Sequence, residues 1–236
     1  MSNFVSYALE GNVATISMDD GKVNTMSLQM LSELNAALDR AEADKAIVVL
    51  TGRTGVFSAG FDLAVLKGGG EPAVNMLTAG FQLSARLLAF PTPVIVASNG
   101  HALAMGIFIV LAADYRIGVD GAYKIGANEV AIGLTMPHTA VVVCRNRLTP
   151  SHFNRAVLTS EIYTPADAVG AGFLDQIVAE ADLPAAAQAA AARMAKLNMP
   201  AFKATKLRAR APSLAAAREA LEKDEAEFRA MMLRPA

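Results

Sequence analysis

The chain has 236 residues, 53% of them hydrophobic, and a formal net charge of -1. This is enough for one substantial core with a small extension. The near-neutral charge leaves no basic excess to hold a phosphate backbone, so we expect no nucleic-acid partner. Residues 1–10 show no signal or transit peptide, and we expect a cytoplasmic protein.

The first part of the chain predicts alternating strands and helices. Residues 4–9 and 13–18 flank a Gly-Asn turn and predict a β-hairpin. Ser27 is a suitable N-cap for a helix with an apolar stripe at Leu31, Leu34 and Leu38. The apolar run 46–51 predicts a strand that is covered on both faces.

Glycine-rich and proline-containing segments separate the next elements. Residues 52–63 predict a loop, and 67–71, with three consecutive glycines, predict a flexible connection. Pro72 can occupy the first turn of a helix. Residues 87–113 lack charged side chains, but prolines and an Asn-Gly-His turn leave an apolar run of only about a dozen residues, shorter than a membrane span. We therefore predict a buried strand–turn–helix unit and no membrane partner.

The remaining chain is mainly helical. We expect helices at 139–148 and after Thr164, which is followed by Pro165 and Asp167 as in a typical helix start. From residue 183 we expect only helices, with a break at Pro200 and a new start at Ser213. The alternation in the first two thirds predicts an α/β fold, divided into a core at 1–182 and a helical region at 183–236.

Several kinds of site are excluded by the motifs. The chain has no Walker A loop, no dinucleotide-binding glycine motif after a strand, no nucleophile elbow and no zinc-protease motif. The histidines lack metal-ligand spacing, so we expect no metal. Cys144 lies in an apolar run and is interpreted as a buried small hydrophobic residue. His101 follows a turn, where bonding to the backbone is favoured over a catalytic role.

Four blocks, taken with their order and spacing, resemble the crotonase, or enoyl-CoA hydratase/isomerase, superfamily. A shorter match, NTMS at 24–27, precedes them, and 164–178 follow the same pattern. The blocks are VFSAGFDL at 56–63, NGHALAMG at 99–106, AADYRI at 112–117 and IGANEVAIG at 125–133.

The resemblance implies a spiral of ββα units whose C-terminal helices build a homotrimer or a dimer of trimers. It implies an acyl-CoA substrate, with coenzyme A as part of the substrate and no separate cofactor. By motif position, the amides of Phe61 and Met105 form an oxyanion hole, in which fixed donors stabilise charge on the thioester oxygen. The substrate-binding positions implied by the same blocks are Ala59, Gly60, Phe61, Asp62, Leu63, Met105 and Phe108.

The catalytic carboxylates distinguish two reactions. Hydratases of this family use two glutamates; the first position falls on Phe108 here and the second on Glu129. Water addition needs a held and activated water, whereas moving a double bond needs one base that takes a proton from C2 and returns it at C4. The pattern therefore favours a Δ3,Δ2-enoyl-CoA isomerase. The alternatives are an enoyl-CoA hydratase and a catalytically silent CoA-binding protein.

The other acids and hydroxyls near these blocks have simpler interpretations. Asp62 is expected to cap the following helix or order its loop, with direct catalysis as the less favoured alternative. Asp114 is expected to be structural, in the turn after the buried helix. Ser58 has no partner base in the sequence and is interpreted as part of the loop structure.

Overall fold

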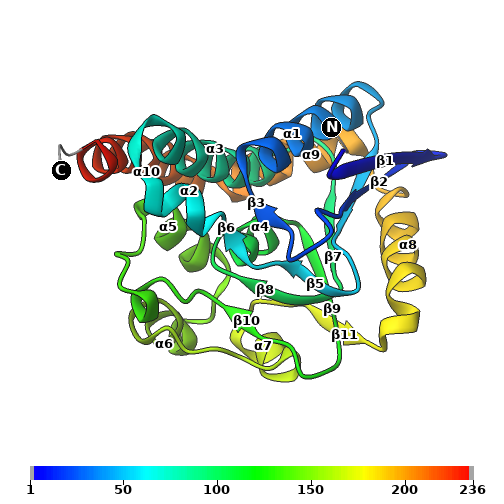
Figure 1. Cartoon of the computed structure of the whole chain (residues 1–236). Coiled ribbons are helices and arrows are strands. Elements are labelled where there is room, and N and C mark those ends of the chain that lie inside the picture. The colour runs from blue at the N-terminus through cyan, green and yellow to red at the C-terminus, as the bar shows by residue number, and fades with distance from the viewer. Residues whose placement is uncertain (1–2, 234–236) are drawn as a thin grey trace.

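The computed structural model describes residues 3–233 and confirms the α/β prediction (Figure 1). The predicted hairpin is present, and its second strand begins a run of parallel pairings. In the described chain the main sheet has the order β1-β2-β4-β7-β9-β11. Its strands are β1 (Val5–Glu10), β2 (Val13–Met18), β4 (Ile47–Thr51), β7 (Val94–Ser98), β9 (Tyr115–Val119) and β11 (Gln176–Val178).

Both faces of the central strands β4 and β7 are buried, as the apolar run 46–51 predicts for β4. Alternate residues of a strand point to opposite faces. Ile47 and Val49 of β4 pack with helix α8 (Leu183–Met194), whereas Val48 and Leu50 belong to the larger core on the other face. That core includes α1 (Leu28–Ala43), α3 (Gly70–Ala89) and α4 (Met105–Ala112). Figure 1 shows α8 on one side of the sheet and α4 on the other.

The predicted loop 52–63 contains two short strands, so that prediction was wrong in part. Strand β5 (Gly55–Ser58) lies beside β8 (Gly100–Leu103), and β10 (Ile125–Gly126) lies on the other side of β8. Strand β6 (Gly60–Phe61) pairs with β3 (Thr25–Met26). Such short strands are fixed by pairing with distant segments, which leaves little local periodicity to detect.

The expected flexible connection at 67–71 is instead a tight helix junction. Helix α2 (Leu63–Gly68) ends there, and α3 begins at Gly70. Gly69 joins them with φ of 64°, a left-handed conformation that glycine adopts without steric cost.

The C-terminal half contains one helix that the sequence analysis did not predict, α6, and the helical region from residue 183 is divided at different places than expected. Pro200 does not end a helix, because it lies in the first turn of α9, where proline is well tolerated. Ser213 lies inside the first turn of α10 and does not start it. The bounds are α5 (His138–Arg147), α6 (Pro150–Thr159), α7 (Pro165–Ala171), the 3₁₀ turn η2 (Glu180–Asp182), α9 (Met199–Ala209) and α10 (Ala211–Met232).

Side chains of helix α10 form hydrogen bonds with helix α5 near both of its ends. The buried carboxylate of Asp224 accepts hydrogen bonds from the backbone N–H groups of His138 and Thr139, at 2.7 and 2.8 Å. These are first-turn donors that lack a partner within their own helix. Ser213 donates to the Asn146 side chain near the other end of α5. Helix α10 also packs as part of the main core through Phe228. The proposed division of the chain at residue 183 stays a prediction.

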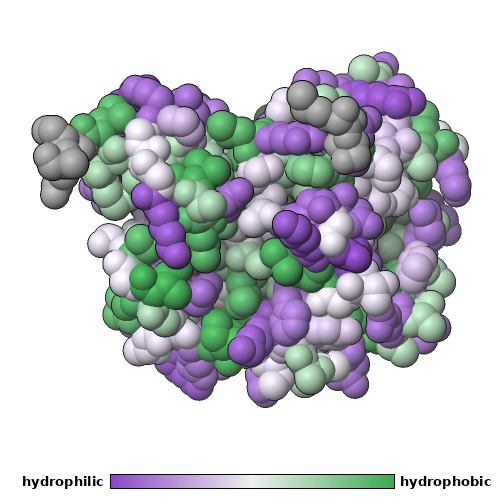
Figure 2. Space-filling model, viewed as in Figure 1, coloured by the Kyte–Doolittle hydropathy of each residue, from purple (hydrophilic) through white to green (hydrophobic). Residues whose placement is uncertain are grey.

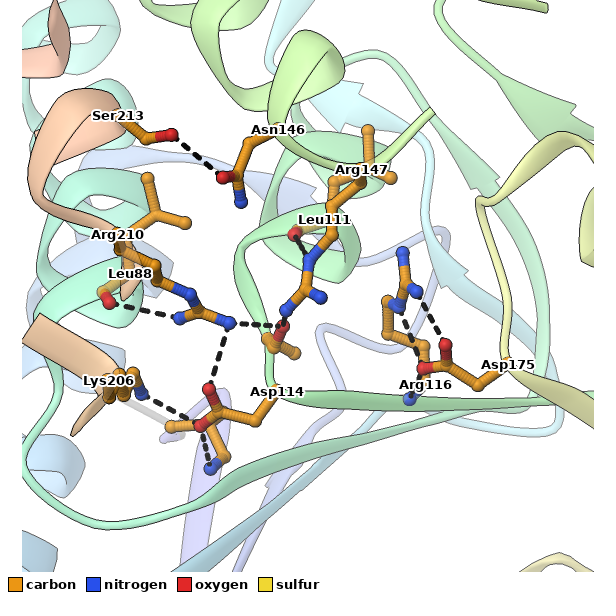
Figure 3. A network of polar contacts seen from close by, with 12 residues as sticks. Leu88, Leu111, Asp114, Arg116, Asn146, Arg147, Asp175, Lys206, Arg210 and Ser213 are labelled. Atoms are coloured by element: carbon orange, nitrogen blue, oxygen red, sulfur yellow. Dashed lines mark hydrogen bonds and ion pairs between the residues drawn. The ribbon is translucent and has the colours of Figure 1, made fainter. Parts of the chain in front are cut away.

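A buried ionic network connects α9 and α10 to the end of α4 (Figure 3). Asp114 accepts from Lys206 at 2.7 Å, from Arg210 at 2.9 Å and from the backbone N–H of Val94 at 2.8 Å. The Lys206 side chain is only 4% exposed, and burial lowers its pKa to about 8 although Asp114 opposes the shift. Arg147 lies beside this group and donates to the carbonyls of Leu111 and Ala113. The structural role predicted for Asp114 is confirmed.

Within residues 3–233, no helix combines the length and apolar character required to cross a bilayer.

Candidate active site

Three candidate residues lie just after the carboxyl ends of three parallel strands. In the sheet β10-β8-β5, Ser58 pairs with Ala102, and Gly126 pairs with Leu103. The carboxyl ends of parallel strands meet at one edge of a sheet, where ligands commonly bind. Phe61 follows β5, Met105 follows β8 and Glu129 follows β10, so the fold brings these residues to one edge.

Glu129 is a buried carboxylate for which no ion pair is found among the described residues. It is 6% exposed and precedes the 3₁₀ turn η1 (Val130–Ile132). Within the described chain, its Oε2 has no hydrogen-bond partner. Burial raises the pKa of Glu129 from 4.5 to about 7, because removing water disfavours the charged form. A carboxyl group with such a pKa can both accept and release a proton near neutral pH.

The thiol of Cys144 is fully buried, as predicted. Burial and the charge of Glu129 both raise its pKa, far above neutral pH. The thiol therefore stays protonated, and a thiolate nucleophile is not formed there.

Met105 is the first residue of α4, and its amide therefore belongs to the end of the helix that carries partial positive charge. The preceding residue, Ala104, has φ of 49°, which is uncommon for a residue with a side chain. Segment β6 packs tightly here: a Cβ placed on Gly60 would lie 2.7 Å from the Ala104 Cβ and 3.3 Å from the Met105 nitrogen. The backbones of the two predicted oxyanion segments are thus in contact.

The Phe61 side chain joins a group of aromatic rings. Its ring packs edge-on against Phe81 at 5.8 Å between centroids, and Phe81 lies 5.9 Å from Phe108. Gly80 makes room for Phe61, because a Cβ there would lie 2.5 Å from the ring. Phe108 is fully buried on α4. The position that the resemblance assigns to a first catalytic acid is therefore occupied by a packed aromatic ring.

The remaining predicted site residues have mixed environments. Asp62 accepts from the amides of Ala64 and Val65 and caps α2, which agrees with its favoured interpretation. Ala59 and Leu63 are exposed, Leu63 by 56%. His101 Nδ1 accepts from the Lys124 amide, as expected for a histidine bonded to backbone. Among residues 3–233, no group of three or more His, Cys, Asp or Glu side chains is arranged to hold a metal ion.

Two buried polar residues beside the site were not identified as important from the sequence. Asn24 and Ser58 are fully buried and hydrogen-bonded to each other. Asn24 has φ of 51°, a left-handed conformation that Asn adopts more readily than most residues with a side chain. The Asn residue itself was therefore the available signal in the sequence. Ser58 gave no comparable signal.

A family model described as enoyl-CoA hydratase/isomerase matches residues 8–234. The human protein named mitochondrial enoyl-CoA delta isomerase 1 is 33% identical over 187 residues, which cover 77% of this chain and 62% of the human protein. A crystal structure of an enoyl-CoA hydratase/isomerase family protein from Pseudomonas syringae superposes with a TM-score of 0.93 at 46% identity, covering 95% of this chain and 98% of that one. An enoyl-CoA hydratase from Mycobacterium marinum gives 0.91 at 44% identity, covering 95% and 99%.

Proposed function

Because the chain belongs to the enoyl-CoA hydratase/isomerase family, we propose that it is an acyl-CoA isomerase that converts 3-enoyl-CoA to 2-enoyl-CoA. The observation that carries the proposal is the buried carboxyl group of Glu129, combined with the packed aromatic ring of Phe108 at the position that the resemblance assigns to the first acid of hydratases. One base suffices for a proton shuttle, whereas water addition needs a held and activated water.

The proposed reaction proceeds in two proton transfers. The Glu129 carboxylate takes a proton from C2 of the substrate, and the electron pair left on C2 delocalises over the double bond and the thioester carbonyl. The amides of Phe61 and Met105 donate hydrogen bonds to the oxygen of this dienolate. Protonated Glu129 then returns the proton to C4, which leaves the double bond between C2 and C3 and restores the carboxylate.

Exposed apolar side chains support the proposed homotrimer or dimer of trimers. Val130, Ile132 and Leu134, in the turn after Glu129, are 45%, 50% and 36% exposed, and Leu158 on α6 is 63% exposed. Figure 2 shows apolar residues gathered over the left of this face, near α2, α5 and α6. Apolar surface of this kind marks interaction sites. In this proposal the enzyme is cytoplasmic, and a second copy covers the turn next to the base.

Two substrates separate the proposed activity from its main alternative. Wild-type protein is expected to move the double bond of 3-hexenoyl-CoA at a rate that saturates with substrate, and to hydrate crotonyl-CoA far more slowly. Both reactions can be followed by the absorbance of the conjugated thioester. Rapid hydration would contradict the isomerase proposal and support a hydratase. Binding of both thioesters without turnover would support a catalytically silent protein.

The pH dependence of the isomerase reaction follows from the raised pKa of Glu129. The base must be ionised to take the C2 proton, so kcat/KM, which reports the free enzyme, is expected to rise about tenfold per pH unit below about pH 7 and to level off above it. Steady-state kcat/KM from pH 5 to 9 measures this. A kcat/KM that is flat across pH 5 to 8 would show that another group accepts the proton.

A further inference from the structure

We propose that Ser58 and Asn24 are positioning residues that hold the Phe61 amide in the geometry of the oxyanion hole. This rests on the proposed function, because Phe61 acts on substrate only if the protein binds an acyl thioester. Both side chains are fully buried, so neither is available to touch substrate directly. Their effect passes through the backbone of Gly60, the residue before Phe61.

The Ser58 hydroxyl connects two backbone groups in one fixed orientation. Its Oγ donates to the carbonyl of Asn24 at 2.7 Å and accepts from the Gly60 N–H at 3.1 Å. A hydroxyl has one proton, and a backbone N–H can only donate. The proton of Ser58 is therefore directed to Asn24, and a lone pair of the oxygen is left for Gly60.

Asn24 is fixed by a second set of bonds. Its side-chain Nδ2 donates to the carbonyls of Met18 and Phe57, at 3.0 and 3.1 Å, and its Oδ1 accepts from the Asp20 amide at 3.0 Å. The left-handed backbone of Asn24 directs its own carbonyl to Ser58. Asn tolerates this conformation and supplies two donors, whereas a leucine or valine there would supply neither property.

The turn that precedes Asn24 is equally ordered. Asp20 accepts hydrogen bonds from the backbone amides of Lys22, Asn24 and Thr25 and from the Thr25 hydroxyl. Burial alone raises the pKa of Asp20, but these hydrogen bonds to the carboxylate outweigh burial and lower it. Thr25 then pairs with Gly60 in the β3–β6 strand pair. The turn is thus connected to Gly60 twice, by the hydrogen bonds of Ser58 and by the β3–β6 strand pair.

The same segment contacts the second proposed donor. A Cβ on Gly106 would lie 2.7 Å from the Ser58 carbonyl oxygen, so the first turn of α4 packs directly on Ser58. Gly60 on the other side contacts Met105, as described above. Ser58 therefore sets the position of β6 relative to α4, which determines the spacing of the two amides.

The test compares Ser58→Ala with Thr92→Val. Thr92 also uses a buried hydroxyl to bond a backbone carbonyl, that of Ala46 at 2.6 Å, but it lies before the amino ends of the central strands β4 and β7. We expect Ser58→Ala to lower kcat for 3-hexenoyl-CoA on the order of 10²-fold, because small misplacement of catalytic groups has effects of this size. Its KM is expected to stay within about twofold, since the lost interaction belongs to the transition state.

Thr92→Val is expected to keep the wild-type kcat even where its melting temperature falls as much as that of Ser58→Ala. Ser58→Cys, with a similar shape and a weaker hydrogen bond, is expected to have an intermediate kcat, and it replaces Ser58→Ala if that variant does not fold. Equal kcat values for the Ser58 variants and Thr92→Val would overturn the proposal.

Hydrogen exchange separates this proposal from the proposed function. The amides of Gly60 and Phe61 are expected to exchange faster in Ser58→Ala than in the wild type, and at the wild-type rate in Thr92→Val. If the wild type moves no double bond, the proposed function fails, and exchange alone decides whether Ser58 orders this segment. Unchanged exchange in Ser58→Ala would refute the ordering role whatever the activity.

Discussion

Glu129→Gln is expected to lower kcat for double-bond migration by between about 10² and 10⁴-fold, the usual contribution of a positioned acid–base group. Glutamine has nearly the same shape but cannot accept the C2 proton at neutral pH. In the proposed mechanism no other residue takes this role. The measurement is kcat with 3-hexenoyl-CoA at pH 8, where the wild-type carboxyl group is ionised.

The free energy of unfolding of Glu129→Gln serves as the control that the variant is folded. The pKa of Glu129 is raised on folding, so its contribution to stability is complete below about pH 4.5 and is lost as pH rises through about 7. This pKa difference corresponds to a loss on the order of 3 kcal/mol in wild-type unfolding free energy. Glu129→Gln carries no such charge and is expected to be more stable than the wild type at pH 8 in urea unfolding.

A matched variant is Glu71→Gln. Glu71 is 56% exposed and pairs with Arg229 on the surface, so we expect it to keep wild-type activity. Full activity of Glu129→Gln would refute the assigned base. A large loss in Glu71→Gln would instead show that a second carboxylate takes part, as a hydratase requires.

Asp114→Ala is expected to lower the free energy of unfolding by about 3–5 kcal/mol. The substitution leaves the side chains of Lys206 and Arg210, which are 4% and 11% exposed, without their carboxylate partner. It also leaves the Val94 amide without its acceptor. Removing one member of a buried ionic group costs more than the group contributes, because the remaining charges stay out of water.

Urea unfolding at pH 7 measures this effect, and Asp39→Ala is the control. Asp39 bonds Arg86 at 2.6 Å, but its side chain is 72% exposed, so its loss is expected to cost less than about 1 kcal/mol. Similar losses for the two variants would show that the Asp114 network contributes no more than an exposed ion pair. Both variants remove a paired Asp carboxylate, one from a buried group with three partners and one from an exposed pair.

Local signals in the sequence predict the longer elements of this fold. Ser27 and Thr164 cap helices as expected, since a capping hydroxyl acts within three residues of itself. The apolar strand at 46–51 is also present. Strand β6 depends on pairing with the distant strand β3. The start of helix α9 is marked by Pro200, which is an ambiguous signal. Pro200 is equally compatible with the end of one helix and the first turn of the next.

The residues of the candidate site likewise differ in whether the sequence predicts them. Glu129 was identified from the family resemblance, and the structure shows that it is buried. The importance of Ser58 was missed because its hydroxyl bonds Asn24, 34 residues earlier, and no local pattern encodes that contact. Long-range hydrogen bonds of this kind become visible only when the chain is folded.

The capping of α5 by Asp224 gives the protein an order of assembly. The carboxylate is 85 residues later in the chain than Thr139, whose amide it accepts. A nascent chain that stops short of residue 224 has made all three site residues, yet α5, the helix after the Glu129 turn, lacks its cap. Contacts over such separations form late, because the loop that they close must first be ordered. The cap of α5 therefore cannot form before residue 224 has left the ribosome.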